Sequence, residues 1–203
     1  FSSLSFLTRI TDNLNIVPAV AFPMMITVEP LANSGFAFSG LASVDIHTHN
    51  LEYTADTPLR FFKAPLGGEL KDITVTMGAG SYRARGSTGK FSQFIIVADL
   101  RPAMTVVDQK FDDLQSALIR FAPQIEPGVY AQLSQLVMDT EQLIANSDVV
   151  AASKKLNQFD QVVSSQRGQN IPDVWRSSRD VTNVAGELMA YANTLRFSLR
   201  LAK

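Results

Sequence analysis

Apolar residues follow two different periods along this chain of 203 residues. Up to about residue 98 they stand in short β-branched and aromatic runs that Gly, Pro and Asn interrupt. From about residue 105 they recur every three or four positions in long segments rich in Ala, Leu and Gln. A period of two is typical of strands and a period of 3.6 of helices. The chain is therefore predicted to be a two-domain α+β protein, with an antiparallel β-sandwich at residues 1–103 and a four-helix bundle at residues 104–203.

Alternation of apolar and polar residues predicts antiparallel strands in the first half. The clearest case sets Ala42, Val44, Ile46 and Thr48 on one side of the chain against Ser43, Asp45, His47 and His49 on the other. Such a strand has one buried and one solvated face. Residues 16–28 predict an edge strand, two short strands or a bulged strand. The reason is that Pro18 and Pro23 have no backbone N–H to donate to a neighbouring strand. The apolar run at residues 94–97 predicts a strand buried on both faces. Six or so short strands indicate a sandwich or a barrel, and we favour the sandwich.

End signals and helical periodicity predict four helices in the second half. Asp, Ser and Asn cap first turns, Pro is tolerated there, and Gly or Asn favours an end. The first helix is predicted to begin at Asp108 and end near Pro123, and the second to begin at Pro127 and end at Asn146. The third is predicted to begin at Ser147 or Asp148 and end at Gly168, and the last to begin after Pro172. Trp175 lies beside the predicted start of that last helix, and we expect it to anchor packing between the last two helices or between the domains. Short connections make sequential helices antiparallel, which gives a bundle.

Residues 151–171 carry a more specific pattern. An Ala-rich turn precedes Leu156, Asn157 and Phe159, and Val162, Gly168 and Ile171 follow. This pattern resembles the FIMAH-type helical domain that occurs near the C termini of many secreted bacterial proteins, and the similarity covers about residues 112–180. The resemblance implies a secreted, non-catalytic accessory module and names no ligand.

Composition excludes several classes of function. A net charge of −1, without a block of like charges, gives no basis for binding nucleic acid or an anionic membrane. Without cysteine the chain has no thiol catalyst, disulfide or cysteine-bound zinc. No apolar run approaches the roughly 20 residues that span a bilayer. Because the sequence starts at Phe1 and no signal peptide is visible, we expect a mature product, secreted or periplasmic, whose export signal has been removed.

The sequence around Asp45, His47 and His49 is the first candidate for chemistry. On a strand, His-x-His places both imidazoles on one side, as a metal site requires. The run also resembles the first-strand motif of metal-dependent amidohydrolases, which would imply a hydrolase. The chain contains no other histidine, and an open zinc site needs three protein ligands, so Asp45 or Glu52 would have to complete it. The sequence favours a solvated polar strand face, with a metal site as the alternative.

The second candidate is a basic, partly aromatic hairpin formed by Tyr82, Arg83, Arg85 and Lys90. Such a hairpin can recognise a phosphate, a carboxylate or a glycan, and an ordinary solvated face is the alternative. The run at residues 85–90 is not a phosphate loop, because Ala84 stands where a Walker loop needs Gly and Phe91 where it needs Ser or Thr. We expect a hairpin turn there instead.

These observations predict a non-catalytic protein of structural, adhesive or ligand-interaction type, without a cofactor and with a protein or glycan partner. The alternatives are a metal-dependent hydrolase that uses His47 and His49, and a carbohydrate-binding module. A carbohydrate-binding module exposes aromatic rings on one sheet face, and the candidates for such rings are Tyr53, Phe61, Phe62 and Tyr82. Because Phe61 and Phe62 are adjacent in the sequence, at most one of them can face outward.

Overall fold

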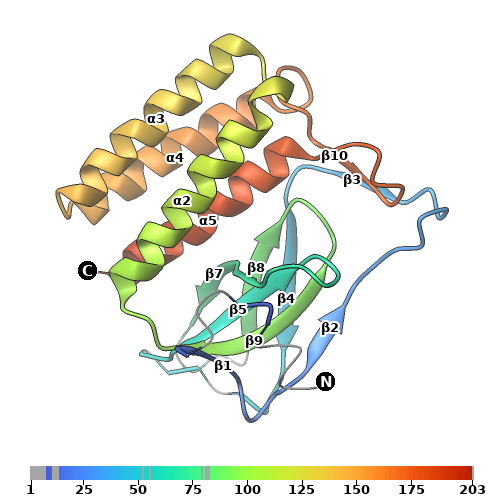
Figure 1. The fold of residues 1–203 in the computed structure, drawn as a ribbon, viewed down its shortest axis with the longest axis vertical. Helices are drawn as coiled ribbons and strands as arrows, with labels where there is room; N and C mark the ends of the chain where they lie inside the picture. The colour runs from blue at the N-terminus through green and yellow to red at the C-terminus, as the bar shows by residue number, and fades with distance from the viewer. Residues whose placement is uncertain are drawn as a thin grey trace. The chain divides into compact units, whose positions relative to one another are not determined.

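The computed structural model describes residues 8–10, 14–51, 53–54, 56–78, 80 and 83–202. In these residues the fold is mixed α+β, with ten strands in open antiparallel sheets and four α-helices in the C-terminal half (Figure 1). The prediction of an α+β chain with strands first and helices after is confirmed. None of the described helices is long and apolar enough to cross a membrane.

The chain divides into two compact units that interleave along the sequence. The first unit takes in Phe1–Pro30, Ser43–Ser87 and Phe91–Arg101. The second unit takes in Leu31–Ala42, Thr88–Lys90 and Pro102–Lys203. A single boundary at residue 103 would assign Leu31–Ala42 and Thr88–Lys90 to the first unit, whereas both segments belong with the helices.

The central strand of the first unit is β9 (Gln93–Asp99), in a five-stranded sheet. On one side it pairs with β1 (Ile16–Pro18) and β2 (Met25–Thr27), and on the other with β5 (Leu59–Ala64), which pairs in turn with β6 (Lys71–Asp72). Residues 94–97 are buried, so the prediction of a strand covered on both faces is confirmed. Of the three alternatives for residues 16–28, the structure has two short strands.

A second sheet of the first unit has the order β4 (Ala42–His47), β8 (Arg83–Thr88), β7 (Thr74–Met77). Side chains from both sheets meet in one core, which includes Ile46, Phe61, Ala84, Phe94 and Ile96. The other face of the five-stranded sheet carries its own apolar cluster, which includes Ile16, Phe62 and Ile95. Strands β5 and β9 are therefore apolar along most of their length because the sheet is covered on both faces.

The helices of the second unit are α2 (Ala103–Phe121), α3 (Pro127–Ala145), α4 (Val149–Gln166) and α5 (Val184–Leu201), with a short 3-10 turn η1 (Ala122–Gln124) after α2. They pack around one apolar core, and α5 contacts both α2 and α4 (Figure 1). Pro127 occupies the first turn of α3, Asn146 caps its C-terminus, and the Asp148 carboxylate caps α4 by accepting the Ala151 N–H at 2.9 Å. Three of the four predicted ends of these helices are confirmed, whereas α4 ends at Gln166 with Arg167 as its C-cap, one residue before the predicted Gly168.

Two predicted helix starts are wrong. Helix α2 begins at Ala103, directly after Pro102, and not at Asp108, because Val106 and Val107 already belong to its buried face. The last helix does not begin after Pro172. Residues Val174–Arg176 form strand β10, which pairs with β3 (Ala37–Ser39), and α5 starts only at Val184.

Candidate functional site

Strand β4 carries the first sequence candidate on its solvated face. Val44 is half-buried and Ile46 is buried, whereas Asp45 and His47 are exposed, as the alternation predicted. His49 follows the strand and is also exposed, and the ring centroids of His47 and His49 lie 5.0 Å apart. The two imidazoles therefore form a pair on the surface.

Strand β8 brings the second sequence candidate to the same face. Arg83 and Arg85 are exposed on it, while Ala84 between them is buried in the core of the first unit. The Arg85 guanidinium donates to Asp45 Oδ2 at 3.0 Å from Nη2 and 3.4 Å from Nε, and Arg83 Nη1 lies 3.8 Å from the same oxygen. Thus two candidates about 40 residues apart in the sequence form one site.

We call this site, made of Asp45, His47, His49, Arg83 and Arg85, the β4–β8 face. Its arginine side chains keep more than half of their surface in solvent, at 57% for Arg83 and 54% for Arg85, against 25% for Asp45. Strand β7 adds Thr76, which is exposed and paired with Arg85 in the strand register. The residues of the face are polar or charged, and both guanidinium groups lie at the surface.

In the residues that the structure describes, no group of three His, Cys, Asp or Glu side chains is placed to hold a metal ion. Asp45, predicted to join His47 and His49, accepts from arginine instead. Glu52, the other predicted third ligand, lies outside the described residues.

Lys90 does not lie with Arg83 and Arg85. It belongs to the second unit, where its Nζ pairs with Glu187 Oε2 at 2.8 Å. The hairpin turn expected in the run at residues 85–90 occupies only its end, because strand β8 continues to Thr88 and the chain bends at Gly89 and Lys90. Tyr82, the fourth member of that predicted hairpin, lies outside the described residues.

Three of the four aromatic residues predicted for carbohydrate stacking are not on the surface, and the fourth, Tyr82, lies outside the described residues. Tyr53 and Phe61 are fully buried and Phe62 is 1% exposed, so none of these three can stack on a sugar. Burial, with the nearby Asp45 charge, raises the pKa of Tyr53 to about 12. Trp175 is also buried, in the β3–β10 pair, where its ring centroid lies 5.6 Å from that of Phe38. It anchors this strand pair and not a helix start.

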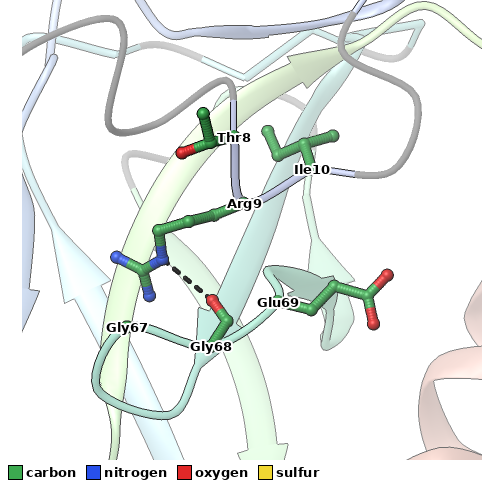
Figure 2. Close-up of a pocket in the computed structure, with 6 residues that line it drawn as sticks. All are labelled: Thr8, Arg9, Ile10, Gly67, Gly68 and Glu69. Carbon is green, nitrogen blue, oxygen red and sulfur yellow. Dashed lines mark hydrogen bonds between the residues drawn. The ribbon is translucent and has the colours of Figure 1, made fainter.

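A small open pocket of about 200 Å³ lies between residues 8–10 and the turn at residues 67–69 (Figure 2). The Arg9 side chain crosses it and donates from Nε to Gly68 O at 2.8 Å and from Nη2 to Pro65 O at 3.1 Å. Partial burial lowers the pKa of Arg9. Since this guanidinium already binds the carbonyls of the turn, the contact ties two segments of the first unit together and offers little to a ligand.

Two polar groups of the second unit, one buried and one half-buried, were not predicted from the sequence. Lys110 Nζ donates to Ser198 Oγ at 2.8 Å and to Thr194 O at 3.2 Å. A Ser–Lys pair can activate a nucleophile, but Lys110 and Ser198 are only 4% and 3% exposed, so substrate cannot reach them. On α4, desolvation raises the pKa of Asp160 to about 6, although Arg196 of α5 pairs with it at 3.0 Å.

A family model described as a family of unknown function, DUF6689, matches residues 1–203, and the chain belongs to this family. A search of the curated proteins finds no match.

Proposed function

We propose that this member of DUF6689 is a non-catalytic binding protein whose β4–β8 face takes an anionic ligand. The observation that carries the proposal is that Asp45 holds Arg83 and Arg85 side by side on an exposed strand pair, next to His47 and His49. Guanidinium groups bind carboxylate, sulfate and phosphate oxygens by paired, charge-assisted hydrogen bonds. An ordered pair of them on a surface is suited to such groups.

Electrostatics favours an anion over a metal cation at this face. A metal bound to the two imidazoles would lie near two guanidinium groups, and the Asp45 charge that could offset the repulsion is already engaged by them. A bound anion, in contrast, interacts favourably with the arginines. The metal-dependent hydrolase that His47 and His49 suggest is therefore the competing hypothesis, and the experiment below tests it.

Among anionic macromolecules we propose an acidic polysaccharide. Among the described residues, those exposed on and beside this face are Ser43, Asp45, His47, His49, Thr76, Arg83 and Arg85, and none of these has a large apolar side chain. Protein interfaces draw most of their affinity from buried aromatic and arginine anchors at an apolar centre. Single-stranded nucleic acids need exposed aromatic rings for base stacking, and a more basic surface than this chain has. A polar ligand that carries carboxylates or sulfates fits the face better than either.

The setting that we propose for this activity is the periplasm or the cell exterior, supported by the resemblance of residues 151–171 to the FIMAH-type helical domain. We also propose that the two units are separate domains. The common core between the sheets of the first unit supports describing that unit as a sandwich. The second unit would then be an accessory helical module.

The proposal is tested by calorimetric binding of polygalacturonate and dextran sulfate, with neutral dextran as the reference. Arg85→Gln is expected to weaken binding of the charged polymers about tenfold, because hydrogen bonds to charged groups contribute roughly 1.5–3 kcal/mol. Arg176→Gln is the matched control: Arg176 pairs with Asp180 at 3.1 Å and its side chain is 53% exposed, against 3.0 Å and 54% for Arg85. This control should bind like wild type. Tighter binding of polygalacturonate would indicate a preference for carboxylate groups, and tighter binding of dextran sulfate a preference for sulfate groups.

Two results would overturn the proposal. One is an equal effect of the Arg85 and Arg176 substitutions, which would show that only net charge matters. The other is a rise in melting temperature with zinc that His47→Ala abolishes, because a metal that binds only the folded protein must stabilise it. The second result would favour the metal-dependent hypothesis.

A further inference from the structure

Strands β4 and β8 each continue from the first unit into the second. They are neighbours in the second sheet of the first unit, yet the first residue of β4, Ala42, and the last residue of β8, Thr88, belong to the second unit. The segments that adjoin these two strand ends, Leu31–Ala42 and Thr88–Lys90, are part of the second unit as well. One strand pair therefore carries the β4–β8 face in the first unit and supplies two segments to the second.

Both segments bind the same side chain, at the N-terminus of α5. The amide Nδ2 of Asn183 donates to Gly40 O at 2.6 Å and to Gly89 O at 3.1 Å. Gly40 lies two residues before the start of β4, and Gly89 directly follows β8. The Oδ1 of the same side chain accepts the Gly186 N–H at 2.8 Å and caps α5. One buried amide thus joins the ends of two neighbouring strands to the start of a helix.

The end of β8 also binds a buried carboxylate in the first turn of α5. Glu187 is 4% exposed, and its Oε1 accepts the Gly89 N–H at 3.2 Å while Lys90 Nζ lies 2.8 Å from its Oε2. A Cβ on Gly89 would lie 2.6 Å from the backbone N of Glu187, so the segment packs directly on the helix. Moving it away would remove a cation from a buried carboxylate, which is unfavourable.

From these contacts we infer that the β4–β8 strand pair is a coupling element, which links the order of the β4–β8 face in the first unit to the order of the α5 N-terminus in the second. Local opening of the strand pair withdraws the carbonyls of Gly40 and Gly89 from Asn183. Local opening of the helix end removes the Asn183 amide from both strands. Each event makes the other more frequent, because a coupling free energy acts in both directions. The inference goes beyond the proposed function, since this coupling requires no ligand.

Amide hydrogen exchange of the native protein, followed residue by residue by NMR, tests the coupling in Asn183→Ser. Serine keeps an oxygen for the helix cap and removes the amide that binds the two strand ends. The protected amides of β4 and β8 should exchange about fivefold faster or more, because loss of one buried hydrogen bond corresponds to roughly that factor in a local equilibrium. The protected amides of β5 and β6, which lie wholly within the first unit, should keep their wild-type rates.

Asp148→Ala is the matched control, because Asp148 caps α4, another helix of the second unit, through the Ala151 N–H at 2.9 Å. It should leave the exchange of β4 and β8 unchanged, and the far-ultraviolet circular dichroism of each variant verifies its fold.

The reverse direction is tested by Gly86→Ala on β8, where a Cβ would lie 2.5 Å from Ile73 Cδ1 in the first unit. The Gly186 N–H, which Asn183 caps, should then exchange faster. Leu70→Ala is the control for this variant, because Leu70 is a buried residue of the first unit outside the strand pair. It should leave the exchange of Gly186 unchanged.

The inference is overturned if Asn183→Ser leaves the exchange of β4 and β8 unchanged, because the two units would then open independently. It is also overturned if all strands of the first unit exchange faster to the same extent, which would indicate global unfolding and not transmission through one strand pair. An equal effect of Asp148→Ala would overturn it too. None of these results bears on the proposed function, because the experiment contains no anionic ligand.

Discussion

Asn183 joins three parts of the second unit, and its replacement by alanine should destabilise that unit by about 3 kcal/mol. Its Oδ1 accepts the Gly186 N–H at 2.8 Å and so caps helix α5. Its Nδ2 donates to Gly40 O at 2.6 Å and to Gly89 O at 3.1 Å, in the two segments that the first hundred residues contribute to this unit. All three hydrogen bonds are buried.

The magnitude follows from counting the groups left without a partner. Loss of an N-cap costs typically about 1 kcal/mol. Each buried carbonyl that loses its donor adds about 1 kcal/mol, since water cannot replace the amide at a residue that is 1% exposed. Asn183→Ser keeps an oxygen for the cap but has no amide to reach the two carbonyls, and so should lose about 2 kcal/mol.

Urea unfolding followed at 222 nm, where helices dominate, measures these differences. Asp148→Ala is the control for the cap alone, because Asp148 caps α4 through one hydrogen bond, to Ala151 N at 2.9 Å, at an exposed residue. It should cost about 1 kcal/mol. If Asn183→Ala costs no more than Asp148→Ala, the bonds to Gly40 and Gly89 contribute nothing and the reasoning is wrong.

Three further predictions concern Asp160, Lys110 and Gly89 of the second unit. Because the pKa of Asp160 is raised to about 6, the folded protein binds the proton of this carboxyl group more tightly than the unfolded chain does. The stability that the protonated carboxyl gives is therefore lost as the pH rises from about 4 to 6. The free energy of unfolding of Asp160→Asn relative to wild type should therefore rise by up to about 3 kcal/mol across that pH window, as measured by urea titration. A difference that stays constant with pH would refute this prediction. Lys110→Met should unfold within about 1 kcal/mol of wild type or be more stable, as replacement of a buried charge by an apolar chain often is, and a loss above 3 kcal/mol would contradict this. Gly89→Ala should lose roughly 2 kcal/mol, because a Cβ there would lie 2.6 Å from the backbone N of Glu187, whereas Gly128→Ala, whose nearest neighbour is a flexible carboxylate at 3.0 Å, should not.

The helical part of the fold was largely predictable from the sequence because its signals are local. Pro127, Asn146 and Asp148 act on their own helix ends, where a cap needs only a residue three positions away. Helix α2 extends beyond the predicted start because Pro102 is itself compatible with the residue before a helix. No capping side chain marks this start, and the periodicity of Val106 and Val107 was too short a signal.

The β3–β10 pair was not predictable, because each partner is three residues long and Trp175 pairs with Phe38 across 137 positions of sequence. Such a strand has too few residues to show a period of two. A similar limit applies to Thr74, a polar residue that is fully buried. Its hydroxyl donates to Asp72 Oδ1 at 2.5 Å and accepts the Phe61 N–H at 2.8 Å, and the register shifts beside it. Satisfied polar groups can be buried, and alternation alone does not reveal them.

The candidate site shows how the sequence gives residue types but not their neighbours. Asp45, His47 and His49 were predicted on one strand face and Arg83 and Arg85 on another, and each set was correctly placed on the surface. The exposed sides of β4 and β8 form one continuous surface because the two strands pair in the same sheet. This pairing changes the chemistry, because the carboxylate that would complete a metal site next to two histidines instead accepts from Arg85 and forms an ion pair with Arg83.

The same reasoning explains the run at residues 85–90, whose Gly and Lys suggested a phosphate loop. The Gly89 N–H donates to Glu187 Oε1 at 3.2 Å, its carbonyl accepts from Asn183 Nδ2 at 3.1 Å, and Lys90 pairs with Glu187 at 2.8 Å. A phosphate-binding loop needs its N–H groups and its lysine to face the ligand. Here both face the buried carboxylate of Glu187, in the first turn of α5. Glycine at position 89 and lysine at position 90 are therefore explained by the packing of a three-residue segment against a helix N-terminus, without any nucleotide.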